Sequence, residues 1–360
     1  MIAYLQLLDD ILANGVQKTD RTGTGTISLF GRMLRFDMVD GFPALTTKKL
    51  YMKGVIHELL WFVSGSTNIQ PLVKNGVRIW TAWPLKHYNQ SNPDATMTQE
   101  EFENRIVSDY TFALRWGELG PVYGKQWRKW NGKVQVYESE STSHTTFPKD
   151  LQVISEDRAW GDVTGFTYID QLQNAIDLLK TTPDSRRIIV NAWNPADIEE
   201  MSKSGLPPCH YAYQFCTRPL SQEEREAIFT RSWFHMGGVI MPKSLDAAGI
   251  PRYKLDILVN MRSTDVYLGA PFNVASYALL LHMVAKLTGM VPGELVLVMA
   301  DCHLYRNHGD QAREQLTRKP YPLPTLQIHG DQKTIDDFKF EDFELVNYQS
   351  WPAISAPIAV

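Results

Sequence analysis

The sequence predicts an α+β fold in which helices pack on one face of a large sheet. Two helical patterns and several strand patterns support this prediction. Residues 55–63 carry a strongly apolar helical face, and residues 274–287 are apolar nearly all round, which is typical of a buried central helix. Strand-like runs of alternating, β-branched or aromatic residues lie at 27–36, 188–190, 211–215, 255–261 and 295–298.

Further along the chain, two more helices are expected. Apolar residues recur at helical spacing over residues 1–15, without the basic flank and cleavage pattern of a signal peptide, and residues 170–180 form a short amphipathic pattern. Polar stretches interrupt these elements at about 84–116, 131–165 and 217–252, and the first of them is irregular. We therefore expect a single domain over residues 1–360 with three surface insertions.

The composition is that of an ordinary soluble protein. Hydrophobic residues make up 44% of the 360 residues, charged residues make up 21%, and the net charge of -4 gives no reason to expect nucleic-acid binding. Cys209, Cys216 and Cys302 are too few for a disulfide scaffold, and no Cys/His spacing indicates zinc. No stretch reaches the roughly 18 apolar residues of a membrane span. We expect a cytoplasmic protein without a metal and without a membrane or nucleic-acid partner.

A cysteine that follows two prolines, in Pro207-Pro208-Cys209-His210, is a candidate nucleophile. The prolines fix φ, so a stiff backbone presents the thiol at the start of a strand. An imidazole beside a thiol is typical of activated nucleophiles. The opposing interpretation is a buried cysteine of ordinary packing, because free cysteines are among the most buried residues. The stretch alone leaves both interpretations open and favours the second.

Three further groups have both a functional and a structural interpretation. Glu58 lies inside an apolar helix, either at a solvated edge or as a general acid or base with a raised pKa. Arg21, in the glycine-rich loop 20–26, either binds a phosphate or is solvated. Trp80 and Trp83 either fill the core or form a stacking platform for a flat ligand.

Nine segments of the chain resemble the thymidylate synthase family, and they occur in the family's order. The segments are DRTGTGT at 20–26, HELLWF at 57–62, GPVYGKQWR at 120–128, DSRR at 184–187, LPPCH at 206–210, RSTD at 262–265, LGAPFN at 268–273, DCHLY at 301–305 and AV at 359–360. Each segment is a weak signal alone, whereas nine in order are specific. The resemblance covers the chain outside the three insertions.

The resemblance implies reductive methylation of dUMP to dTMP, with 5,10-methylenetetrahydrofolate as co-substrate and dihydrofolate as co-product. It implies that Cys209 adds to C6 of the pyrimidine as a thiolate, which nearby arginines would favour. Two alternatives stay open: a dUMP 5-hydroxymethylase of the same family, in which water replaces the hydride, and a non-catalytic nucleotide- or RNA-binding relative. Trp80 and the intact tail favour methylation by excluding water. Cys209, Glu58 and the arginines argue against the binding relative.

The resemblance also implies a role for each matching residue. The dUMP phosphate is assigned to Arg21, Arg186, Arg187, Arg262 and Ser263. Asn273 is assigned to the uracil edge, because related deoxycytidylate hydroxymethylases carry aspartate there, and the deoxyribose hydroxyl is assigned to His303 and Tyr305. The other catalytic assignments are Glu58, Tyr123, His210 and Asp265. The folate pocket and its closing flap are assigned to Ile79, Trp80, Trp83, Leu206, Asp265, Leu268, Gly269, Phe272, Ala359 and Val360, and the folate's glutamate tail to Lys48.

Arg186 and Arg187 raise a geometric question, since neighbouring side chains on a strand point to opposite faces. They share a ligand only where the strand start bends or lies at an interface. The resemblance implies a large mixed, twisted sheet that meets the sheet of a second copy in a homodimer, with this arginine pair contributed across the interface. Departures from the family's pattern are the insertions, Cys216, Thr217 and Ser66.

Overall fold

A six-stranded sheet forms the centre of the computed structural model, which describes residues 1–358 except 138–147, 157–162, 205 and 236–244. Its strands are β1 (Val16–Lys18), β2 (Thr26–Asp37), β8 (Ile189–Asn191), β9 (His210–Pro219), β10 (Tyr253–Asp265) and β11 (Val291–Tyr305). Their order is β1-β2-β11-β10-β9-β8. Only β10 and β11 are parallel neighbours, so this sheet is mixed. The combination of sheet and helices confirms the predicted α+β class.

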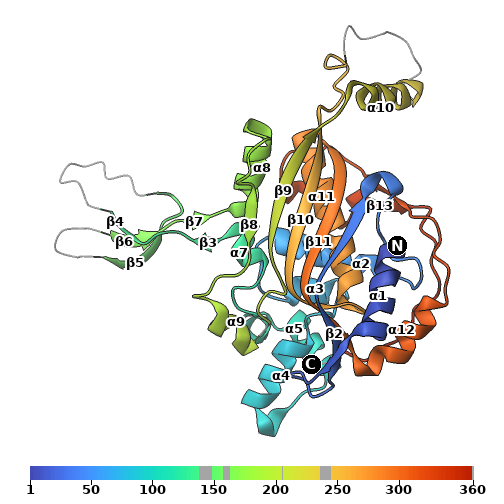
Figure 1. Ribbon diagram of the computed structural model, residues 1–360. Helices are drawn as coiled ribbons and strands as arrows, with labels where there is room; N and C mark the ends of the chain where they lie inside the picture. The colour runs from blue at the N-terminus through green and yellow to red at the C-terminus, as the bar shows by residue number, and fades with distance from the viewer. Residues whose placement is uncertain (138–147, 157–162, 205, 236–244, 359–360) are drawn as a thin grey trace, which may run out of the picture.

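Helices cover one face of this sheet (Figure 1). Along β10, Leu255, Ile257 and Val259 are fully buried, whereas Asp256 and Leu258 between them stay partly exposed. This alternation means that one face packs on the core and the other is left accessible in the single chain. The core-side elements are α1 (Ile2–Asn14), α2 (Met52–Val63), α8 (Gln171–Thr181) and α11 (Gly269–Thr288).

The central helix α11 is longer than the sequence pattern predicts. The helix already begins at Gly269, five residues before the apolar pattern over 274–287 starts. Pro271 lies in the first turn of the helix, where backbone N–H groups have no acceptor within the helix. Its missing N–H therefore costs no helical hydrogen bond. At the other end, Gly289 adopts φ 66° and its N–H returns to the carbonyl of Ala285, which ends the helix. Asn273 is therefore carried by a rigid helical turn.

The segment predicted as irregular, 84–116, is helical and packed into the core. It contains α4 (Ala82–Ser91), α5 (Gln99–Ser108) and α6 (Tyr110–Trp116). Thr98 and Glu101 cap α5 reciprocally, and Asp109 caps α6. Phe102 and Phe112 bury their rings against each other at 5.5 Å between centroids. The expectation of irregular structure there is wrong, because the caps and this apolar face form a small helical layer.

The other two polar segments project from the body (Figure 1). Within 131–165, a small sheet has the order β4-β6-β5, formed by β4 (Gln135–Tyr137), β5 (Gln152–Glu156) and β6 (Val163–Phe166). Within 217–252, the described part contains α10 (Gln222–His235), which has Glu223 and Glu224 in its first turn. Parts of both predicted insertions lie outside the described residues.

The remaining elements are short. They are α3 (Gln70–Lys74), α7 (Gly124–Arg128), α9 (Ile198–Ser204), α12 (Gly309–Leu316), β3 (Trp130–Asn131), β7 (Tyr168–Ile169), β12 (Thr325–Ile328), β13 (Phe343–Val346) and the 3-10 turns η1 (Met38–Asp40), η2 (Pro93–Ala95), η3 (Arg306–His308), η4 (Ile335–Asp337) and η5 (Phe340–Asp342). Among the described helices, none is both long enough and apolar enough to cross a bilayer.

Candidate active site

A cavity of about 820 Å³ opens where the parallel strands β10 and β11 end. The register places Ser263 opposite Asp301 and Asp265 opposite His303. Because the carboxyl ends of parallel strands meet at one edge of a sheet, polar side chains from two distant segments come together there. The loop before β2, the first turn of α11 and one side of α4 complete the wall.

Many of the predicted site residues line this cavity: Arg21, Trp83, Leu206, Cys209, Arg262, Ser263, Asp265, Gly269, Asn273, His303 and Tyr305. Others lie outside its wall. Ile79, Trp80, Leu268 and Phe272 pack on or in the hydrophobic core. Arg186 and Arg187 are exposed on a turn before β8. Ala359 and Val360 lie outside the described residues.

Sequence reasoning missed several cavity residues, among them Lys18, Lys86, His87, Ser202, Asp301 and Ile358. Two signals were available. Asp301 precedes His303 and Tyr305 at the two-residue spacing of one strand face, and His87 follows Trp83 at the four-residue spacing of one helix face. No group of three or more His, Cys, Asp or Glu side chains that could hold a metal ion occurs in the described part of the chain.

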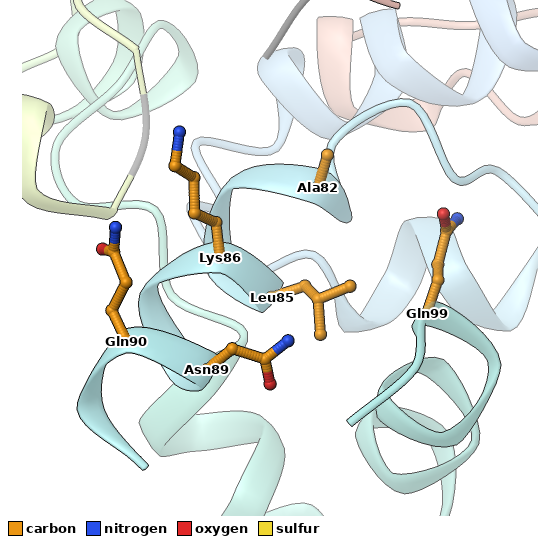
Figure 2. Close-up of a pocket in the computed structure, with 6 residues that line it drawn as sticks. All are labelled: Ala82, Leu85, Lys86, Asn89, Gln90 and Gln99. Carbon is orange, nitrogen blue, oxygen red and sulfur yellow. The ribbon is translucent and has the colours of Figure 1, made fainter. Parts of the chain in front are cut away.

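A second hollow lies beside this cavity on α4 (Figure 2). Lys86 and Gln90 border both spaces, and their side chains leave the helix on one side, while Leu85 and Asn89 turn towards Gln99. The amide of Asn89 is bonded to both backbone groups of Met97, so this polar lining is already satisfied within the protein. The candidate reactive groups therefore belong to the larger cavity.

Arg262 fixes the backbone that presents Cys209. Its Nε donates to the carbonyl of Pro208 at 2.9 Å, its Nη2 donates to that of Pro207 at 2.8 Å, and its own N–H donates to that of Cys209 at 2.8 Å. These carbonyls need donors because a buried backbone acceptor without one is costly. The same Nη2 lies 3.9 Å from Cys209 Sγ. One guanidinium thus holds both the Pro-Pro-Cys backbone and the thiol.

Two opposing effects act on the pKa of the Cys209 thiol. Burial raises this pKa, the guanidinium of Arg262 opposes the rise, and the net direction is upward. Arg262 therefore favours the thiolate, as expected, but burial outweighs this effect in the single chain. Cys209 also donates its backbone N–H to Tyr123 Oη at 2.9 Å. Tyr123 has φ 25°, a strained value for a residue with a side chain, at the start of α7.

Glu58 lies on α2 and accepts a hydrogen bond from Trp80 Nε1 at 2.8 Å. Burial raises the pKa of Glu58 to about 7, although its side chain is not fully enclosed. Both its protonated and its charged form are therefore accessible near neutral pH, which favours the acid–base interpretation over the solvated edge. Trp80 itself fills the core, with ring centroids 5.4 Å from Trp83 and 5.9 Å from Tyr123.

His210 directly follows Cys209 in the chain and is buried. Its ring stacks on Tyr123 at 4.1 Å, and its Nδ1 lies 2.7 Å from Tyr277 Oη. Burial lowers the pKa of His210 to about 3, so the imidazole is neutral at physiological pH. It therefore connects two tyrosines through packing and a hydrogen bond and contributes no charge.

The far wall of the cavity offers groups suited to a hydroxyl. His303 and Tyr305 face it from β11, with ring centroids 5.3 Å apart. Asp301, on the same face, has one oxygen 3.4 Å from His303 Nδ1 and the other 3.4 Å from Lys18 Nζ. An imidazole and a phenol together supply donors and acceptors of the kind that bind sugar hydroxyls.

The loop 20–26 presents Arg21 to the cavity. Gly25 has φ 78° and lies in the left-handed region, which glycine adopts without strain. The carboxylate of Asp20 holds the loop by accepting the N–H groups of Gly25 at 2.6 Å and Thr22 at 2.8 Å. Arg21 and Arg262 both line the cavity, and this pair of guanidinium groups gives it an anion-binding character.

Lys48 is buried beside Tyr267. It is 8% exposed, its Nζ donates to the carbonyl of Tyr267 at 2.7 Å, and the ammonium lies 3.3 Å from the centre of the Tyr267 ring. Burial lowers the pKa of Lys48 to about 7. In this structure the amine is enclosed and holds the turn that follows Asp265, so contact of Lys48 with a glutamate tail stays a prediction.

Comparison with known proteins gives one consistent result. The family model described as Thymidylate synthase matches residues 2–360. A thymidylate synthase of Mycoplasma mobile is 41% identical over 360 residues, covering 100% of both chains. That of Sinorhizobium fredii is 41% identical over 358 residues, covering 99% of this chain and 97% of the relative. One from Cereibacter sphaeroides is 41% identical over 358 residues, covering 99% and 98%.

Proposed function

This chain belongs to the thymidylate synthase family, and we propose that it methylates dUMP to dTMP at the cavity around Cys209. The co-substrate we propose is 5,10-methylenetetrahydrofolate, which supplies both the one-carbon unit and the hydride. The observation that carries the proposal is the convergence of a clamped thiol, two guanidinium groups and an amide side chain on one cavity.

In the proposed reaction, the Cys209 sulfur forms a bond to C6 of the uracil ring, which makes C5 a nucleophilic carbon. C5 attacks the one-carbon unit and then loses its proton. Elimination of the folate leaves an exocyclic methylene, and a hydride returned by the folate converts it to the methyl group. Cys209 leaves C6 as a thiolate. The products are dTMP and dihydrofolate, so no external reductant is needed.

We assign the dUMP phosphate to Arg21, Arg262 and Ser263 of the same chain, together with the partner subunit's Arg186 and Arg187. The first three line the cavity. In the single chain, Arg186 and Arg187 are exposed and away from its wall. A contribution across an interface reconciles this position with a phosphate-binding role. A phosphate among several guanidinium groups is held by charge-assisted hydrogen bonds.

The nucleoside is proposed to lie between Asn273 and the pair formed by His303 and Tyr305. The amide of Asn273 has both a donor and an acceptor, which match N3–H and O4 of uracil. Glu58, whose pKa lies near 7, exchanges protons with the ring through water, and Tyr123 and His210 hold this side of the site.

The folate is proposed to stack over the nucleotide against Trp83, Leu206, Asp265 and Gly269, which line the cavity. Ile79, Trp80, Leu268 and Phe272 pack in or on the hydrophobic core, and we propose that they support this pocket from outside its wall. We also assign Ala359 to this pocket, as a continuation of the tail from Ile358, which lines the cavity.

We further propose a homodimer and a cytoplasmic location. The sheet face turned away from the helices leaves Met33 and Ile189 52% and 44% exposed, and Leu258 on the same face is also accessible. An apolar sheet face of this kind suits burial against a second copy. The three cysteines are unpaired, which fits a reducing compartment.

Product analysis tests the activity directly. The protein is incubated with dUMP and 5,10-methylenetetrahydrofolate, and the nucleotide is identified by mass while dihydrofolate absorbance is followed. We expect equal amounts of dTMP and dihydrofolate. Formation of 5-hydroxymethyl-dUMP without dihydrofolate would instead identify the hydroxymethylase, and nucleotide binding without turnover would identify a binding protein.

Substitution of the nucleophile tests its assignment. Cys209→Ser should lower kcat by at least ~10³-fold, since a removed catalytic nucleophile costs rate on that scale. Binding of dUMP, measured by calorimetry, should survive because the arginines are intact. Full activity of this variant would refute Cys209 as the nucleophile.

A further inference from the structure

The C-terminal tail returns to the cavity along a defined path. Ile358 lines the cavity wall, although its side chain is 62% exposed. One residue earlier, the carbonyl oxygen of Pro357 lies 2.7 Å from Nε2 of His308. Arg318 Nη1 holds the tail further back, at the carbonyl of Pro352, with a distance of 2.7 Å. Among the described contacts, the bond from His308 is the polar attachment of the tail nearest the cavity.

His308 is a buried residue at the centre of several site elements. It is 0% exposed and ends η3, which directly follows β11. Its ring centroid lies 5.7 Å from that of Tyr305, which lines the cavity, and 5.4 Å from that of Tyr267. Tyr267 is in turn held by Lys48 and by the carboxylate of Asp265. One imidazole therefore touches the tail, the proposed sugar-binding wall and the turn after Asp265.

The hydrogen bonding of His308 indicates what the imidazole is for. A carbonyl oxygen only accepts, so Nε2 carries the hydrogen. Nδ1 is buried and has no partner in the described structure. Within the described residues, the bond to Pro357 is therefore the one hydrogen bond that the His308 ring makes. A buried N–H that loses its acceptor costs free energy. The N–H of His308 therefore favours the state in which the tail is docked.

We propose that His308 is a positioning residue that holds the C-terminal tail over the cavity and thereby sets the affinity for the folate co-substrate. It does so through Pro357 and Ile358, without touching either substrate. The inference about affinity rests on the proposed function, whereas the inference about tail docking does not.

A pair of variants separates the hydrogen bond from the packing. His308→Phe keeps an aromatic ring and removes the donor, while His308→Gln carries an amide N–H that reaches the position of Nε2. We expect amide hydrogen exchange in peptide 353–358 to become about fivefold to tenfold faster in His308→Phe, the scale of one lost hydrogen bond. The KM for the folate should rise by a similar factor, with the Kd for dUMP unchanged. His308→Gln should restore both.

Shortening the chain gives a second, independent test. In a protein that ends at Ala356, the partner of His308 is gone, so His308→Phe should change neither the folate KM nor kcat further. An equal effect of His308→Phe in the full and the shortened chain would overturn the proposal, as would unchanged tail exchange in the full chain. If dUMP is not turned over at all, the proposed function fails, but faster tail exchange in His308→Phe would still support the anchor.

Discussion

The segments 82–116 and 130–169 overlap two of the predicted insertions, but they pack in opposite ways. In the first, Phe102 and Ile106 are 0% exposed. In the second, Val136 and Ile154 are 62% and 57% exposed, and the small sheet projects from the body (Figure 1). The first segment also gives Trp83, Lys86 and His87 to the cavity, and the described part of the second gives it none. The helical segment is thus part of the core and the site, whereas the projecting sheet is an appendage.

The largest effect is expected for Glu58, which is bonded to a residue just before the helical segment. Trp80, just before α4, donates to the carboxylate of Glu58. Glu58→Gln keeps an acceptor for Trp80 and removes the titrating group, so we expect kcat to fall about 10²–10⁴-fold, as for loss of a general acid or base. Steady-state kinetics at pH 7 provides the measurement, and thermal unfolding of the variant controls for folding. A fall below threefold would contradict an acid–base role.

The core contribution of the helical segment is tested by Phe102→Ala. We expect the free energy of unfolding to fall by about 3–5 kcal/mol, because truncation of a buried phenylalanine removes its burial and leaves a cavity. Leu114→Ala, in the same segment but at a position 56% exposed, is the matched control and should cost less than about 0.5 kcal/mol. Urea denaturation of both variants gives the values. Equal losses of stability in the two variants would contradict the core role of Phe102.

The pH dependence of stability tests the buried carboxyl of Glu58. Its pKa is raised from 4.5 to about 7, so the folded protein keeps a proton that the unfolded chain has lost within this interval. The stabilising contribution is complete at low pH and is lost as pH rises from about 4.5 to 7, with a slope of up to about 1.4 kcal/mol per pH unit.

His210 has the opposite sign, because its pKa is lowered to about 3 and the unfolded chain binds the proton more strongly below pH 6.5. The difference between the parent and Glu58→Gln therefore isolates Glu58. Relative to the parent, the variant should gain stability as pH rises from 4.5 to 7, measured by urea denaturation across that range. A pH-independent difference would contradict the raised pKa.

The smallest effect is expected on the projecting sheet. Ile154→Thr replaces an exposed β-branched residue on β5 by another, so the free energy of unfolding should change by less than about 0.5 kcal/mol. The KM values for dUMP and the folate should stay as in the parent. A tenfold change in either KM would show that this appendage contributes to the site and would remove the distinction between the two segments.

Local patterns in the sequence predict part of this architecture. Alternation predicts β10 and the side shared by His303 and Tyr305, and the two prolines predict a rigidly held Cys209. The caps of α5 and α6, at Thr98 and Asp109, were also readable, although the polar composition between them suggested irregular structure.

Other features depend on contacts that no local pattern contains. Lys48 bonds a carbonyl 219 positions away in the chain, and Arg262 bonds the carbonyl of Pro208, 54 positions away. Lys48 becomes buried and Arg262 becomes oriented only when the sheet has assembled. The resemblance to a family supplied candidate roles for residues such as Arg186, whose exposed position in the single chain gives no such indication.

The pairing of β2 with β11 has a consequence for biosynthesis. Thr26 pairs with Tyr305 and Phe36 with Leu295, so the first long strand receives this neighbour only near the end of translation. Until then, one edge of β2 lacks its neighbour and is a template for wrong pairing. The loop of Arg21 likewise meets His303 only after that late closure. A prematurely terminated product therefore lacks the cavity and exposes the edge of β2. In the full chain, pairing between strands this far apart in sequence favours slow folding.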